Sequence, residues 1–78
     1  MEFDKDKVDE ATLALLFLVM FREGDGHRAW KSFDWDTMDR LCQKGWIHEP
    51  KGKAKSVRVT SDGARKAEAL FQQLFGHA

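Results

Sequence analysis

Apolar side chains recur at helical spacing after Asp34, in the segment WDTMDRLCQK. Asp34 can accept hydrogen bonds from the first free N–H groups of a helix, and Asp36 complements the positive end of the helix dipole. Gly45 follows this segment, and a glycine there can adopt the left-handed conformation that ends many helices. The pattern therefore predicts a short helix that ends before Gly45, with an apolar face made of Trp35, Met38, Leu41 and Cys42.

A β-hairpin is predicted directly after this helix. Residues 46–49 and 55–60 have strand character, and residues 50–52 are the turn formers Pro-Lys-Gly. Two valines of the second segment alternate with Ser56 and Arg58, which indicates one buried side and one solvent-facing side. A short helix followed by a hairpin with a basic tip is the order of elements in a winged-helix domain.

Every residue from 11 to 21 except Thr12 is apolar, so the first predicted helix has no polar face. In one interpretation it is a central helix, covered by the other helices and the hairpin. In the other it packs against the same helix of a second copy, because a large exposed apolar patch is unusual on a small monomer. We expect a homodimer, with Leu13, Phe17 and Met20 in the two-fold interface.

The end of the chain predicts a further helix. Thr60 or Ser61 can cap its first turn, and Gly76 can end it. Its apolar stripe, which we expect to be core, has the spacing i, i+3, i+4, i+7 and i+8 and consists of Ala67, Leu70, Phe71, Leu74 and Phe75.

Few residues separate the first helix from the second. Residues 23–27 read EGDGH and predict a loop. What remains before Asp34 is enough for about one helical turn, which we expect around residues 28–32. The support helix of a winged-helix domain would then be abbreviated.

Length and composition limit the possible functions. The 78 residues are enough for one domain, residues 1–78, and 13 basic side chains balance 13 acidic ones. Cys42 is the only cysteine, so no internal disulfide can form, and no spacing resembles a zinc site. The N-terminus lacks a signal-peptide pattern, and the apolar run is too short to span a bilayer. We expect a cytoplasmic protein without membrane association.

The distribution of charge suggests contact with double-stranded DNA. The hairpin carries basic residues with no carboxylate between them, and these would hold phosphates: Lys51, Lys53, Lys55 and Arg58. Arg40 and Gln43 would face a groove and read guanine and adenine edges. Asp36 and Asp39 lie on the same helix face and oppose this, because carboxylates repel the phosphate backbone. A solvated hairpin tip whose lysines prevent edge pairing is the simpler alternative.

Other residues offer little chemistry. The tryptophans Trp30, Trp35 and Trp46 could form a stacking platform for single-stranded bases, but we expect them to close the core. The three histidines are scattered, and Cys42 lies on the predicted inner helix face, which argues against a Cys–His dyad. We expect no enzyme activity, cofactor, metal site or small-molecule substrate.

Two resemblances add to this pattern. L-x-x-K-G-x-I in residues 41–47, K-S-V-x-V-T in residues 55–60 and the following Gly63 resemble the second half of winged helices of the multiple-antibiotic-resistance-regulator type. Over nearly its full length the chain also resembles a family of short bacterial proteins catalogued as a domain of unknown function. That family is marked by an apolar first helix, R-A-W-K-x-F-D-W in residues 28–35 and G-K-A-K-S-V in residues 52–57. It implies no activity.

The sequence therefore predicts an α+β, abbreviated winged-helix-like domain with three main helices and a β-hairpin wing. Two functions remain open. The first is a small DNA-binding regulator, which the uninterrupted basic hairpin favours. The second is a homodimeric protein-interaction module of winged-helix shape that does not bind DNA, which Asp36 and Asp39 favour.

Overall fold

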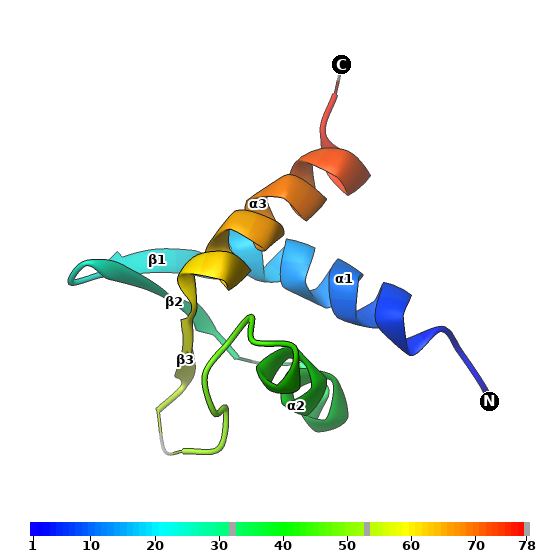
Figure 1. Cartoon of the computed structure of the whole chain (residues 1–78), viewed down its shortest axis with the longest axis horizontal. Coiled ribbons are helices and arrows are strands. Elements are labelled where there is room, and N and C mark those ends of the chain that lie inside the picture. Colours follow the sequence, from blue (N-terminus) through cyan, green and yellow to red (C-terminus); the bar gives the residue numbers. More distant parts are fainter. Residues whose placement is uncertain (32, 53, 78) are drawn as a thin grey trace.

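The computed structural model describes residues 1–31, 33–52 and 54–77. Its elements, in chain order, are α1 (Lys5–Leu16), the 3-10 turn η1 (Phe17–Val19), β1 (Met20–Glu23), β2 (Gly26–Trp30), α2 (Trp35–Gln43), β3 (Ser56–Val59) and α3 (Ser61–Phe75). The strands form an antiparallel sheet in the order β1-β2-β3. Figure 1 shows this sheet on one side of the molecule and the helices on the other. The fold class is therefore α+β, as the sequence predicts.

The apolar run of residues 11–21 is not one helix. α1 begins earlier, where the Asp4 side chain accepts a hydrogen bond from the backbone N–H of Lys7, and it ends at Leu16. The chain then passes through η1 into β1, which pairs with β2 around a turn where Gly24 has φ +63°. An apolar run satisfies either a buried helix or a buried strand, and the cross-strand pairing decides in favour of the strand.

The helical turn expected around residues 28–32 is also wrong. Gly26–Trp30 form β2, which is hydrogen-bonded to β1 on one side and to β3 on the other. Along β2, Ala29 is buried whereas Arg28 and Trp30 point away from the core, which is strand alternation. Ser32 lies outside the described residues. In residues 23–27, Gly24 and Asp25 form the turn, and the others belong to the strands.

The hairpin predicted after α2 forms only in part. Ile47 makes an isolated antiparallel bridge with Val59, and the His48 N–H donates to the Arg58 carbonyl at 2.9 Å. The rest of the first predicted strand has no ladder among the described residues, whereas β2 pairs with the whole of β3. Lys31 Nζ donates to the carbonyl oxygens of Pro50 at 2.5 Å and Gly52 at 3.3 Å. The loop between Ile47 and β3 is thus fastened to the end of β2.

Buried apolar side chains from the helices and strands form one core. They are Leu13, Ala14, Leu16, Ala29, Met38, Leu41, Ile47, Val57, Val59, Ala67 and Leu70. α1 packs against both α2 and α3, which agrees with a central position of this helix. Leu13 has no exposed surface, so it cannot contact a second copy. Phe17 and Met20 are partly buried against the same core.

One junction joins the end of α2 to the start of α3. Gly45 has φ +81° and ends α2, as predicted, and the Trp46 N–H donates to the Leu41 carbonyl at 3.0 Å. The Thr60 hydroxyl donates to the Gly45 carbonyl at 2.7 Å and accepts from the Gly63 N–H at 2.8 Å. Gly63 lies so close to Trp46 that an added Cβ would overlap the Trp46 carbonyl group.

We therefore expect Gly63→Ala to destabilise the protein by about 2 kcal/mol or more, since backbone atoms cannot move aside as a side chain can. Gly52→Ala is the matched control, because a Cβ at Gly52 meets no atom. Urea unfolding followed by circular dichroism measures both. Equal stabilities of the two variants would contradict the close approach at the junction.

Candidate nucleic-acid interface

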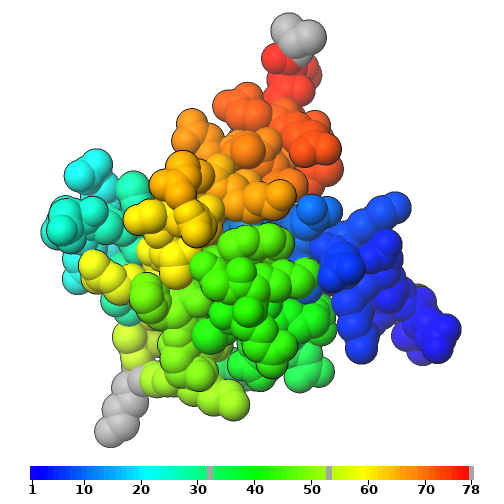
Figure 2. Space-filling model, viewed as in Figure 1, coloured from blue at the N-terminus to red at the C-terminus, as the bar shows by residue number. Residues whose placement is uncertain are grey.

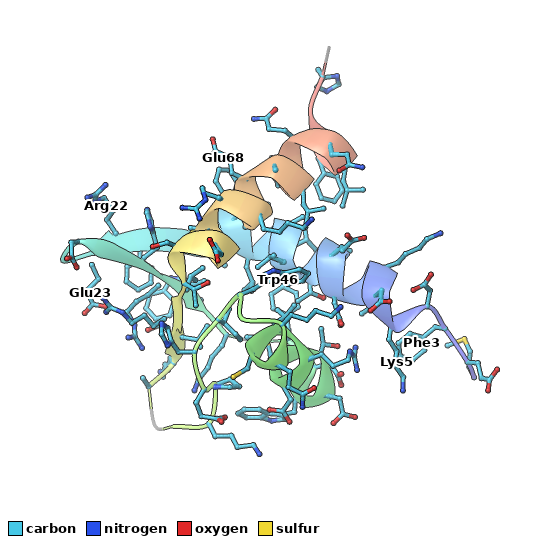
Figure 3. All side chains as sticks on the ribbon, viewed as in Figure 1. Phe3, Lys5, Arg22, Glu23, Trp46 and Glu68 are labelled. Atoms are coloured by element: carbon cyan, nitrogen blue, oxygen red, sulfur yellow. The ribbon has the colours of Figure 1, made fainter. Side chains whose placement is uncertain are left out.

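The sheet has an inner face against the helices and an outer face toward solvent. Strand alternation places Met20, Ala29, Val57 and Val59 on the inner side, where they are buried or packed against the core. Figure 3 shows Arg22 and Glu23 projecting to opposite sides of β1, as this alternation requires. The outer sheet face then consists of Phe21, Glu23, Gly26, Arg28, Trp30, Ser56 and Arg58.

Two aromatic rings occupy one end of the outer sheet face. The ring centroids of Phe21 and Trp30 are 5.2 Å apart with an interplanar angle of 35°. Trp30 is 52% exposed and Trp35, at the start of α2, is 57% exposed. The expectation that these two tryptophans close the core is therefore wrong. It holds for Trp46, which is partly buried against the core.

Two arginines occupy the middle of the outer sheet face, where Arg28 and Arg58 are direct cross-strand partners. Arg28 Nε donates to the Ser56 hydroxyl at 2.8 Å, and this guanidinium also forms an ion pair with Glu23 at 3.2 Å. The exposed Arg58 guanidinium extends over Gly26, whose missing side chain leaves room for it. No ion pair of Arg58 is found among residues 1–31, 33–52 and 54–77.

The loop beside β3 carries further positive charge. Lys51 and Lys55 are exposed, whereas Lys53, the third predicted phosphate contact, lies outside the described residues. The loop forms the lower edge of the molecule in the space-filling view (Figure 2). The structure therefore places Lys51 and Lys55 in the loop next to the sheet and Arg58 on the following strand, β3.

The predicted base-reading residues of α2 have a different environment. Gln43 is exposed, but Arg40 Nε donates to both carboxylate oxygens of Asp9, at 2.8 and 3.0 Å. Arg40 and Gln43 line a surface hollow together with two residues near the N-terminus, Phe3 and Lys5. Three carboxylates complete the lining: Asp34, Asp36 and Asp39. Neither Lys51 nor Lys55 lines it. This face of α2 is therefore acidic, and its arginine is already engaged.

Asp9 is a residue that the sequence analysis missed. Its side chain has no exposed surface, and it forms ion pairs with Arg40 at 2.8 Å and Lys44 at 2.9 Å. Lys44 also contacts the exposed Asp6 at 2.9 Å. Hydrogen bonds to Asp9 and then to Asp6 raise the pKa of Lys44 above its usual 10.5, and the hydrogen bond from Lys44 lowers the pKa of Asp6 below its usual 3.8. A signal was present, because Asp9 stands four residues before Leu13 on the inner face of α1.

Asp9→Asn should destabilise the protein by about 2 to 3 kcal/mol, less than a fully buried pair would lose, because Arg40 and Lys44 retain contact with water. Asp6→Asn removes the same charge from the same lysine, but Asp6 is 85% exposed, so we expect little change. Chemical unfolding at neutral pH compares the two variants. A similar decrease in the free energy of unfolding of both variants would mean that the burial of Asp9 does not increase its contribution to stability.

The described ranges contain neither a membrane-spanning helix nor a metal-binding cluster. None of the helices there is long and apolar enough to cross a membrane. No cluster of three or more histidine, cysteine, aspartate or glutamate side chains suited to a metal ion occurs in the same ranges. Cys42 is partly buried and carries a free thiol.

Comparison with known proteins places the chain in a family. A family model described as "Domain of unknown function (DUF6429)" matches residues 4–77. The uncharacterized protein y4hR of Sinorhizobium fredii (strain NBRC 101917 / NGR234) is 49% identical over 75 residues, which span 96% of this chain and 97% of that protein. No solved structure matches the chain. The resemblance to a small family of unknown function is therefore confirmed, and the chain belongs to the DUF6429 family.

Proposed function

We propose that this protein binds nucleic acid, with double-stranded DNA as the ligand that its order of elements favours. α2, the bridge at Ile47 and β3 follow one another as a recognition helix and a wing do in winged-helix domains. β3 lies between β2 and the Ile47 bridge, so the wing would be part of the sheet rather than a separate hairpin.

The observation that carries the proposal is the position of Arg58. Its guanidinium is exposed on the outer sheet face next to Arg28, and no carboxylate occurs between Lys51 and Arg58 in the sequence. Phosphate contacts from arginine and lysine supply most of the affinity of non-specific nucleic-acid binding. Three described basic residues, Lys51, Lys55 and Arg58, would therefore contact consecutive phosphates.

Lys31 supports the proposal because it holds the loop in place. Its ammonium group binds two loop carbonyls, those of Pro50 and Gly52, and so fixes the backbone on both sides of Lys51. A loop that is ordered before it binds loses less conformational entropy on binding. Lys31 would act through the loop, whereas Lys51 would contact phosphate.

The contacts of Arg40 change the role proposed for α2. To read a guanine edge, Arg40 would have to leave Asp9. A carboxylate that has no exposed surface would then lose one of its ion-pair partners, which is energetically costly. Asp36 and Asp39 would also approach the phosphate backbone. We therefore place the interface on β3 and the loop, and we assign Arg40 to holding α2 against α1.

Titration of labelled duplex DNA at several salt concentrations, followed by fluorescence anisotropy, tests the proposal. The logarithm of the binding constant should fall linearly with the logarithm of salt concentration. Lys51→Gln combined with Lys55→Gln should reduce the slope by about 2, since each phosphate contact contributes about 0.9. The control combines Lys5→Gln and Lys7→Gln at the far end of α1, which removes equal charge away from the sheet (Figure 1). Absence of binding at low salt would refute the proposal.

A homodimeric protein-interaction module is the second candidate, and an exposed apolar surface favours it. Large apolar side chains on α1, η1 and the last turn of α3 remain exposed, and we call them the apolar helix face: Leu15, Leu18, Val19, Leu74 and Phe75. The half-buried rings of Phe17 in η1 and Phe71 in α3 contact each other, with 5.3 Å between their centroids. A second copy of the chain would cover this surface, because patches of this kind are uncommon on monomers.

Sedimentation equilibrium tests this second candidate. Leu18 is 63% exposed, so Leu18→Glu should leave the fold intact but convert a dimer into a monomer, because an unpaired carboxylate would be buried in the interface. Trp35→Gln is the matched control, since Trp35 is similarly exposed but lies on α2. A wild-type protein that is monomeric at every concentration would rule out the homodimer.

A further inference from the structure

We infer that the outer sheet face binds the unpaired bases of single-stranded nucleic acid, with Trp30 and Phe21 as stacking partners. The inference rests on the proposed function, because Arg58 and the loop would hold the phosphates of the same strand. It assigns a chemical class of ligand to a surface that duplex binding alone does not explain.

The aromatic pair has ring surface that the fold leaves unused. The contact between Phe21 and Trp30 covers part of each ring, yet Trp30 remains 52% exposed. A cross-strand aromatic pair can stabilise a hairpin, but that role requires no exposed ring surface. Each nucleobase has a π face, and stacking on an aromatic side chain contributes about 1 to 3 kcal/mol per base. An exposed tryptophan on the solvent-facing side of a sheet is suited to this contact.

Charge around the rings is suited to a nucleic-acid strand. Phe21, Arg28 and Arg58 form one row across β1, β2 and β3, because each is the direct partner of the next. Neighbouring strands are separated by about 4.8 Å, so one nucleotide could contact the rings while the next approaches the arginines. Glu23, the carboxylate on this face, is already paired with Arg28.

The position of Arg28 is set by its contacts within the sheet. Its guanidinium donates to the hydroxyl and to the carbonyl oxygen of Ser56, at 2.8 and 3.0 Å. A planar guanidinium held in one orientation can stack on a base, as aromatic rings do. Arg28 therefore extends the stacking surface from Trp30 toward Arg58, whose exposed guanidinium could approach a phosphate.

The surface requires bases that are not paired. In a duplex the base faces are stacked inside the helix and only edges and phosphates are accessible, whereas unstacked bases can lie on aromatic side chains. The helices pack on the opposite side of the sheet, so the outer sheet face is open to an extended strand (Figure 1).

Trp35 provides an internal comparison. It is 57% exposed, close to the 52% of Trp30, and Lys31 Nζ lies 5.9 Å from its ring centroid, so Trp35 also has accessible ring surface. However, Trp35 is at the start of α2, next to Asp34 and Asp36, where the surface is acidic. Stacking of bases should therefore depend on Trp30 and not on Trp35.

Anisotropy titrations with labelled oligothymidylate of about 12 nucleotides and with a duplex of equal length test the inference. Trp30→Leu keeps an apolar contact for Phe21 but removes the π face. It should weaken oligothymidylate binding about 10-fold and leave duplex binding unchanged, because the variant loses the stacking of one base. Trp30→Phe should restore most of the single-strand affinity, and Trp35→Leu should match the wild type. Thermal unfolding of each variant confirms that the fold is retained.

The remaining outcomes separate the inference from the proposed function. If Trp30→Leu binds oligothymidylate with wild-type affinity, the stacking surface is refuted. It is also refuted if the substitution lowers the affinities for oligothymidylate and for the duplex by the same factor. In both cases the proposed phosphate binding by the wild-type protein stands. If neither nucleic acid binds the wild-type protein at low salt, both fail. A loss in Trp35→Leu equal to that in Trp30→Leu would also overturn the inference.

Discussion

The buried carboxylate of Asp9 is the interaction on which the arrangement of the helices depends. A charge with no exposed surface is tolerated only with partners, and Arg40 and Lys44 of the second helix and its cap supply them. In the observed packing of α1 against α2, both cations reach Asp9. This packing places Gly45, the residue that ends α2, and with it the point where Trp46 and Thr60 meet. One ion-pair cluster thus specifies how the middle of the chain is placed on its first helix.

Local chemistry explains which parts of the fold could be predicted from the sequence. Asp34 and Thr60 begin their helices and Gly45 ends α2, as expected, because helix caps depend on residues within one turn. Val57 and Val59 are buried on one side of β3, as their alternation indicates. The errors at residues 11–21 and 28–32 have a different origin. Both segments satisfy two local patterns, and pairing between β1, β2 and β3 decides between them.

The candidate interface was predictable to a smaller extent, because it depends on contacts between distant segments. The basic character of residues 51–58 is visible in the sequence. The engagement of Arg40 is not, since its partner Asp9 lies 31 residues earlier in the chain. Trp30 could be recognised as outward-facing only after residues 26–30 were known to be a strand, and its pairing with Phe21 follows from the β1–β2 register. Because the sequence pattern predicts a helical turn around residues 28–32, it does not predict the aromatic pair at the end of the sheet.

The single hydroxyl of Thr60 has a consequence for motion in this small protein. It accepts from the first turn of α3 and donates to the carbonyl of the glycine that ends α2. Two helix ends, which usually fray independently, therefore share one hydrogen-bonding group and would open together as a cooperative unit. The turn at Gly24, where φ is +63°, lies outside this unit. Any adjustment of the surface to a ligand would then take place at the rim of the sheet, while the helices move as one body.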